Sequence, residues 1–299
     1  MPLTEVPDSG EPRSSGRGTT TDSPLVLVAE RIRRNFGAVV AVADGTLRLR
    51  EGETLGLVGD NGAGKSTLLK ILAGVLAPDG GRIVLDDHEV VLKGPRDALR
   101  AGIETVYQDL ALVDTMSAAQ NVFLGREVLH RSKVLRAFNL VDSRHMRERS
   151  REILDSLHVK VPSVRANVKQ MSGGQRQSLA IARSVLWGRR IVILDEPTAA
   201  LGVQESSQVL QLISRLKEHR VSVILVTHNM QHLVEVANRV TVMRLGRTVA
   251  TRTISETTTE EIVGLITGAI RPDEESSASE NEPVGSGSEP APASPSTVT

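Results

Sequence analysis

The run Gly59-Asp-Asn-Gly-Ala-Gly-Lys-Ser-Thr67 limits what this chain can fold into more than any other part of it. It matches the phosphate-loop pattern G-x-x-x-x-G-K-[ST], which functions only between a β-strand and the start of an α-helix. Residues 53–58 are typical of a buried strand, and the pattern from Lys65 to about Ala73 predicts a helix that ends at Gly74. We therefore expect a nucleotide site on an α/β scaffold.

Each residue type in this loop has a chemical reason to be there. Glycines let successive N–H groups turn toward phosphate oxygens, and the helix N-terminus adds its positive end. We expect Lys65 to pair with the β- and γ-phosphates and Ser66 to offer its hydroxyl to Mg²⁺. The predicted nucleotide-binding residues are Gly59, Asp60, Asn61, Gly62, Ala63, Gly64, Lys65, Ser66 and Thr67.

A second run, Ile191-Val-Ile-Leu-Asp-Glu-Pro197, predicts a buried strand that ends in two carboxylates. The carboxyl edge of a parallel sheet is where ligands of such sheets collect. Asp195 is expected to hold Mg²⁺ opposite Ser66, and Glu196 to act as the general base for an attacking water. Taken alone the run is better explained as a strand leading into a loop, but its pairing with the phosphate loop favours the catalytic interpretation.

A third motif, Met171-Ser-Gly-Gly-Gln175, stands at the start of an apparent helix that runs to about Trp187. A Ser-Gly-Gly turn before a helix leaves N–H groups and a hydroxyl pointing outward, which is a second anion site. One nucleotide rarely needs two such sites within one chain. Both are used if two copies meet head to tail and each completes the site of the other.

Strand patterns alternate with helical ones over much of the chain. Besides Thr46–Arg50, further strands are expected near 82–85, 103–107, 190–194, 221–227, 239–244 and 247–251, with a helix near 258–267. Between about 109 and 170 the strand signal disappears, and Asp142–His158 predicts an amphipathic helix. These patterns indicate an α/β fold with a mostly parallel sheet and a helical insertion.

The composition excludes several classes of protein. The chain has no cysteine, hence no disulfide, zinc–thiolate site or thiol nucleophile, and no run of 18 apolar residues that would span a membrane. Residues 1–24 and 271–299 are polar, and we expect both tails to be disordered, leaving 25–270 as the folded unit. The tails are acidic, so the folded unit carries a net charge of +7 although the whole chain is neutral. Without a secretory signal, a soluble cytoplasmic protein is expected.

The order of these motifs resembles the ATPase subunit of ABC (ATP-binding cassette) transporters. The resemblance implies a RecA-like P-loop NTPase core with an antiparallel β element on its N-terminal side and a helical subdomain over about 109–170. It implies that Gln108 reports the metal site to that subdomain and that His228 contacts the γ-phosphate. It also implies that Phe36 stacks on adenine, although a phenylalanine in the core is the alternative. The family's signature matches Ser172, Gly173, Gly174 and Gln175.

The sequence Pro-Thr-Ala-Ala-Leu-Gly-Val203 departs from the family, because glycine stands at position 202 where an aspartate is usual. Loss of that carboxylate predicts a change in communication between the two sites. The same region resembles importers of ribose, xylose or fructose, in their single-cassette form. The resemblance implies ATP and Mg²⁺ as cofactors, a homodimer of cassettes on the inner face of the membrane, permease subunits as partners, and indirect contact with an extracytoplasmic sugar-binding protein.

Other classes of ABC ATPase fit less well. A DNA-repair type requires a long coiled coil, but only 63 residues separate Gln108 from Ser172. A translation factor normally carries two cassettes, and a non-enzymatic adaptor is opposed by Glu196 and His228. An importer of another small solute remains the main alternative. The scattered basic residues lack interleaved aromatics, so no nucleic-acid partner is expected.

Overall fold

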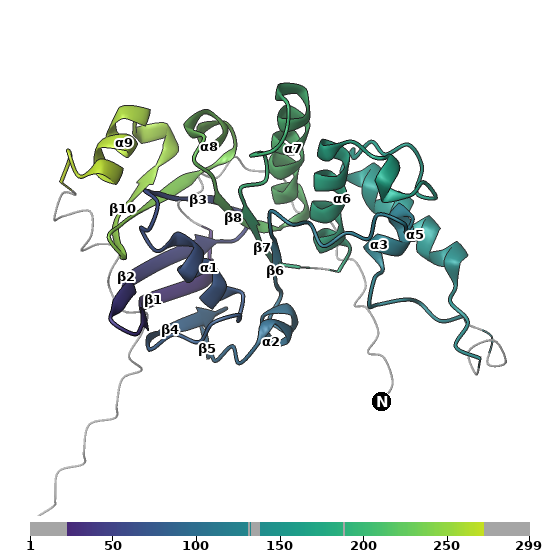
Figure 1. Ribbon diagram of the computed structural model, residues 1–299, viewed down its shortest axis with the longest axis horizontal. Coiled ribbons are helices and arrows are strands. Elements are labelled where there is room, and N and C mark those ends of the chain that lie inside the picture. Colours follow the sequence, from purple (N-terminus) through teal and green to yellow (C-terminus); the bar gives the residue numbers. More distant parts are fainter. Residues whose placement is uncertain (1–22, 131, 133–137, 188, 272–299) are drawn as a thin grey trace, which may run out of the picture.

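One mixed sheet forms the centre of the computed structural model, which describes residues 23–130, 132, 138–187 and 189–271. Its strand order is β5-β4-β1-β2-β10-β9-β3-β8-β7-β6 (Figure 1). The strands are β1 (Leu25–Phe36), β2 (Val39–Arg50), β3 (Thr54–Gly59), β4 (Gly80–Leu85), β5 (His88–Val90), β6 (Ile103–Val106), β7 (Ile191–Asp195), β8 (Ser222–Val226), β9 (Arg239–Arg244) and β10 (Arg247–Thr253). The tails predicted to be disordered lie almost wholly outside the described residues.

Helices connect and cover these strands. They are α1 (Lys65–Leu72), α2 (Pro95–Arg100), α3 (Ala118–Val122), α5 (Ser143–Ser156), α6 (Gly173–Leu186), α7 (Val203–Leu216), α8 (Met230–Val236) and α9 (Thr259–Thr267). The helices predicted near 65–73, 142–158, 172–187 and 258–267 are confirmed as α1, α5, α6 and α9. None of the described helices is long and apolar enough to cross a membrane.

The half of the sheet that contains the phosphate loop and Asp195 is parallel. Strands β9, β3, β8, β7 and β6 pair side by side in the same direction. All five residues of β8 are buried, as the continuous apolar run predicted for a strand covered on both faces. Parallel pairing brings the carboxyl ends of β3, β7 and β8 to one edge, and this edge supports the candidate site.

The other half of the sheet is antiparallel, as the resemblance implied. Strands β1 and β2 form a hairpin around Gly37, with β4 on the other side of β1 and β5 at the edge. The prediction covered only Thr46–Arg50, whereas β2 begins at Val39. Strand β1 was missed because β-bulges between Ala29 and Asn35 interrupt the alternation of buried and exposed residues that identifies a strand.

A helical region lies at one end of the molecule, where α3, α5 and α6 group together in Figure 1. In α5, Asp142 accepts a hydrogen bond from the N–H of His145 and so caps the helix, and Met146 and Leu154 are buried. Phe123 packs edge-on against Trp187 with 5.3 Å between ring centroids. As predicted, this region contributes no strand to the central sheet among its described residues; it makes only isolated bridges at Ser117 and Leu129.

Replacing Phe123 by alanine should test whether this aromatic contact supports the helical region. Phe123 is 3% exposed, so Phe123→Ala leaves a cavity and should lower the free energy of unfolding by about 3–5 kcal/mol. Urea denaturation followed by circular dichroism measures this loss. The matched control, Phe36→Ala, removes an exposed ring and should change stability little; equal losses in the two variants would contradict the assignment.

Candidate functional site

The phosphate loop lies between β3 and α1, as the motif requires. Gly59 and Gly64 have φ angles of 153° and 100°, which a residue with a Cβ rarely adopts. A Cβ at Gly59 would also lie 2.2 Å from the carbonyl oxygen of Met243, and one at Gly64 would lie 2.6 Å from that of Ala41. These glycines are therefore required by the close approach of neighbouring backbone, which holds the loop in one shape.

Lys65 belongs to the loop, and its side chain contacts the backbone of the loop itself. Its ammonium donates hydrogen bonds to the carbonyl oxygens of Gly59 (2.7 Å) and Asp60 (2.9 Å). Burial lowers the pKa of Lys65, while the charges of Glu196, Asp60 and Asp195 act in the opposite direction. The cation thus faces both the loop and the carboxylates at the end of β7. Ser66, in the first turn of α1, is exposed.

Asp195 ends β7 at the same edge of the sheet. Burial raises the pKa of this carboxyl, Glu196 adds to the rise, and Lys65 and Lys70 oppose it. Among the described residues there is no group of three or more His, Asp or Glu side chains that could hold a metal ion. The oxygen donors of Asp195 and Ser66 suit Mg²⁺, which typically takes one or two protein ligands and completes its shell with phosphates and water.

Glu196 has a strained backbone. Its φ of 52° is in the left-handed region, and its N–H donates to the carbonyl of Val226 at 2.9 Å, which holds the turn against β8. One carboxylate oxygen, Oε1, lies 2.9 Å from Nδ1 of His228. The other, Oε2, is buried and has no hydrogen-bond partner among the described residues. An unpaired carboxylate oxygen keeps its capacity to accept a proton, and water reaches this one only after the side chains around it move.

Ser172 and Gln175 form a capping box at the start of α6. The Gln175 N–H donates to the Ser172 hydroxyl oxygen at 3.4 Å, and the Ser172 N–H donates to the Gln175 side chain at 3.0 Å. Gly173 and Gly174 follow as the first helical residues, with their N–H groups at the positive end of the helix. In Figure 1, α6 lies well apart from α1, so one subunit does not bring this turn to its own phosphate loop.

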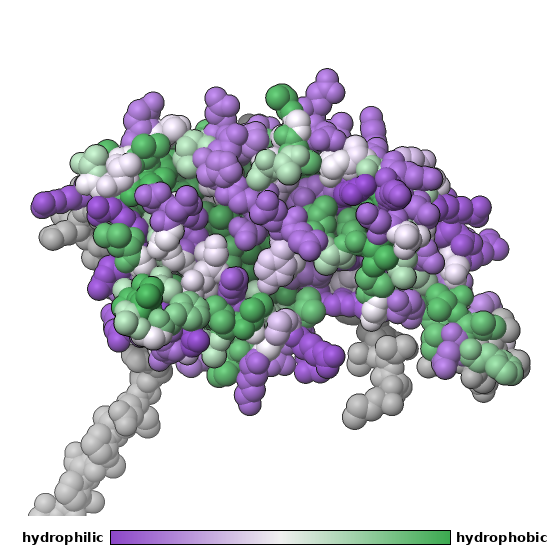
Figure 2. Space-filling model, viewed as in Figure 1, coloured by the Kyte–Doolittle hydropathy of each residue, from purple (hydrophilic) through white to green (hydrophobic). Residues whose placement is uncertain are grey.

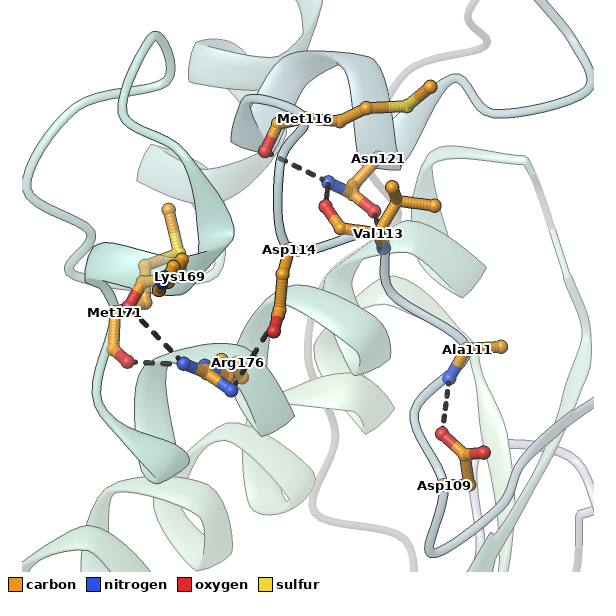
Figure 3. Close-up of polar contacts among 9 residues, drawn as sticks. All are labelled: Asp109, Ala111, Val113, Asp114, Met116, Asn121, Lys169, Met171 and Arg176. Atoms are coloured by element: carbon orange, nitrogen blue, oxygen red, sulfur yellow. Dashed lines mark hydrogen bonds and ion pairs between the residues drawn. The ribbon is translucent and has the colours of Figure 1, made fainter.

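Arg176 stabilises the backbone just before that turn, a role that the sequence did not reveal. Figure 3 shows its guanidinium donating to the carbonyl oxygens of Met171 (3.2 Å) and Lys169 (3.3 Å). It also forms an ion pair with Asp114 at 3.7 Å. The signature turn is therefore tied to the segment that follows Gln108.

Asn121 fixes the same segment and was also missed. It is fully buried in α3, and its Oδ1 accepts a hydrogen bond from the N–H of Val113 (2.7 Å). Its Nδ2 donates to the carbonyls of Val113 and Met116 (Figure 3) and to that of Ser117. A buried amide on a short helix cannot be recognised in the sequence, because only the fold shows which backbone groups lack partners. Gln108 itself lies exposed just after β6.

Phe36 ends β1 and is 46% exposed, so the alternative of a core phenylalanine is wrong. The guanidinium of Arg34 lies 5.1 Å from the ring centroid, a cation–π distance. An exposed ring of this kind can stack on a planar base. Contact with adenine stays a prediction.

The segment after Glu196 borders a cavity of about 380 Å³. Its lining includes Thr198, Leu201 and His232, and the Thr198 hydroxyl lies 3.0 Å from Nδ1 of His232. Gly202 then caps α7 with an ordinary φ of −69° and open space where a Cβ would be. Its glycine is not required by the backbone, and its effect on communication between sites stays a prediction.

Comparisons with known proteins agree on one family. Residues 42–199 match the ABC transporter family model. The chain is 40% identical over 242 residues to the xylose/arabinose import ATP-binding protein XylG of Sulfolobus acidocaldarius, covering 81% of this chain and 94% of that protein. It is 39% identical over 254 residues to the fructose import ATP-binding protein FrcA of Rhizobium meliloti, covering 85% and 98%.

Solved structures show the same fold. An ATP-binding cassette of an ABC transporter in its ADP conformation superposes with a TM-score of 0.69 at 21% identity, over 87% of this chain and all of that one. A dimeric cassette bound to ADP and phosphate gives 0.61 at 23% identity, over 76% and 98%. The α/β architecture with its helical insertion is therefore that of an ATP-binding cassette.

The role of Arg176 in shaping the signature turn is open to a direct test. Arg176→Ala removes two charge-assisted hydrogen bonds to the backbone around Ser172, so the amides of residues 173–175 should exchange with solvent about tenfold faster. Hydrogen–deuterium exchange measured by mass spectrometry reports this change. Arg151→Ala, on the exposed face of α5, is the control and should leave these amides as they are. Unchanged exchange in Arg176→Ala would remove the assigned role.

Proposed function

This chain belongs to the ABC transporter family, and on that premise we propose that it is the ATP-hydrolysing subunit of a sugar importer. The observation that carries the proposal is that the phosphate loop after β3 and the Asp195–Glu196 pair at the end of β7 lie at one edge of the sheet, where both carboxylates act on the charge of Lys65. This arrangement combines a phosphate-binding cation, a metal-binding carboxylate and a base. The sugar is supported by the relatives XylG and FrcA, whose names describe import of xylose or arabinose and of fructose.

ATP binds in this proposal with its phosphates in the Gly59–Thr67 loop. The N–H groups of the loop and of the first turn of α1 donate to phosphate oxygens. Lys65 exchanges its bonds to the Gly59 and Asp60 carbonyls for bonds to the β- and γ-phosphates, and Phe36 stacks on adenine. Ser66, Gln108 and Asp195 would hold Mg²⁺, which when bound neutralises phosphate charge.

Hydrolysis then depends on Glu196. Its carboxylate accepts a proton from a water molecule as the water oxygen attacks the γ-phosphorus, once the side chains around Oε2 have moved to admit that water. The bond from the γ-phosphorus to the bridging oxygen breaks, and ADP carries the electron pair away. His228 orients Glu196 through its 2.9 Å contact, and Lys65 and His228 stabilise the charge on the transferring group.

Two copies of the chain are needed for complete sites. Because α6 lies apart from α1 within one subunit, the Ser172–Gln175 turn serves the nucleotide of a second copy. A cassette of similar fold is a dimer in its solved structure. We place each ATP between the phosphate loop of one subunit and the signature turn of the other.

A membrane permease is the proposed partner, docked on the helical region at the inner face of the membrane. Exposed apolar side chains gather there, and Figure 2 shows hydrophobic surface at that end of the molecule. They are Leu124, Leu129, Phe138, Leu140 and Val141. Arg176 and Asp114 connect this region to the signature turn, so ATP-driven closure moves the permease. An extracytoplasmic sugar-binding protein would act on the permease and so reach this subunit indirectly.

Substitution of Glu196 separates binding from hydrolysis. Glu196→Gln removes the base and should lower ATP turnover at least a hundredfold, while ATP binding persists and a closed dimer accumulates. Phosphate release and size-exclusion chromatography measure the two effects. Lys65→Ala should instead lose nucleotide binding. Normal turnover in Glu196→Gln would remove the assigned base.

The transported solute is tested in membranes that contain the permease and its binding protein. We expect one of xylose, arabinose, ribose or fructose to stimulate ATP hydrolysis by the wild-type subunit several-fold over the other sugars. The Glu196→Gln subunit, assembled in the same way, is the control and should show no stimulation. Stimulation by a non-sugar solute alone would overturn the sugar assignment but leave the ATPase in place.

A further inference from the structure

Glu205 has a second contact beyond its own helix. It stands in the first turn of α7, where its carboxylate accepts a hydrogen bond from the Gly202 N–H at 3.4 Å. The side chain of Glu205 also lies against the start of α6, where a Cβ added to Gly173 would be 3.7 Å from its Oε2, and the Ser172 hydroxyl and the Gly174 N–H act on its charge. The carboxylate thus lies across the gap between α7 and the signature turn.

Gly174 leaves room for this side chain, and Gly173 lies beside its carboxylate. A Cβ added to Gly174 would lie 2.8 Å from Cβ of Glu205, and one added to Gly173 would lie 3.7 Å from its Oε2. Any larger residue at 174 would therefore push Glu205 away. Within one subunit, the acidic side chain of Glu205 fills the space that the missing Cβ of Gly174 leaves.

Glu205 is charged in this position. The Ser172 hydroxyl lowers the pKa of its carboxyl most, followed by the N–H groups of Gly174 and Gly202. The positive ends of α6 and α7 both favour an anion there. Glu205 is half-buried, so its side chain can turn toward solvent and keep only the bond to Gly202.

We propose that Glu205 is an internal anion that occupies the signature turn in the separate subunit and that the γ-phosphate of the partner's ATP must displace it. This rests on the proposed function, because the γ-phosphate reaches the turn only when two cassettes meet head to tail. The Ser172 hydroxyl has one hydrogen and the Gly174 N–H has one, so neither can serve both anions fully. A carboxylate next to the γ-phosphate would also repel it. Glu205 therefore weakens the ATP-bound dimer, because the γ-phosphate must displace it from the turn.

The test measures ATP-dependent dimerisation in the full chain carrying Glu196→Gln, which prevents hydrolysis. Glu205→Gln keeps the size of the side chain and an oxygen for the Gly202 N–H but removes the charge. Its dimer dissociation constant in ATP, measured by sedimentation velocity, should fall about tenfold. Glu218→Gln removes the same charge beyond the far end of α7, about 20 Å away along the helix, and should leave the constant unchanged.

The outcomes distinguish this inference from the function on which it rests. If the Glu196→Gln chain does not dimerise in ATP, the head-to-tail arrangement and the inference both fall. If it dimerises but Glu205→Gln at unchanged Tm binds its partner equally or more weakly, only the inference falls, because a merely structural contact would not tighten the dimer when lost. Should Glu205→Gln fold poorly, Glu205→Ala is compared in the same way, and tightening is expected there too. Tightening in ADP, which has no γ-phosphate, would also overturn the proposal.

Discussion

Before ATP binds, the site depends on the bonds from the Lys65 ammonium to the Gly59 and Asp60 carbonyls. They close the phosphate loop around a cation and direct that cation toward the carboxylates at the end of β7. Neighbouring backbone packs so closely against the loop that a Cβ at Gly59 or Gly64 would have no space, and this packing holds the loop in its shape. A rigid loop at the edge of a parallel sheet is organised for phosphate before any nucleotide arrives, which limits the reorganisation needed during hydrolysis.

The left-handed backbone conformation of Glu196 is unfavourable, and contacts within the fold compensate for it. A left-handed φ at a residue other than glycine is unfavourable by about 1–3 kcal/mol, and the turn is maintained by a hydrogen bond to Val226 on the fully buried β8. The strain directs one oxygen to His228 and leaves the other without a partner in the described structure. The position of the Glu196 carboxylate, and with it the proposed role of this residue as a base, therefore depends on strand β8.

The signature turn is organised from two directions. Arg176 donates a hydrogen bond to the backbone just before the turn and pairs with Asp114, and the carboxylate of Glu205 lies beside the turn itself. Neither role could be predicted from the sequence, because Arg176 looks like any charged helix residue and Glu205 like a simple helix cap. Strand β1 could not be predicted for a different reason: its bulges disrupt the alternation of buried and exposed residues by which strands are recognised.

The sequence by itself determined the phosphate loop, the Asp195–Glu196 pair and the Ser-Gly-Gly turn, because each depends on residue types at short, regular spacings. The strands of the parallel half and the helices α1, α5, α6 and α9 followed from periodicity for the same reason. Only the tertiary structure decided that Phe36 is exposed and that α6 lies apart from α1. It also decided that Glu205 reaches across to Ser172, since contacts between side chains on different helices depend on how those helices pack.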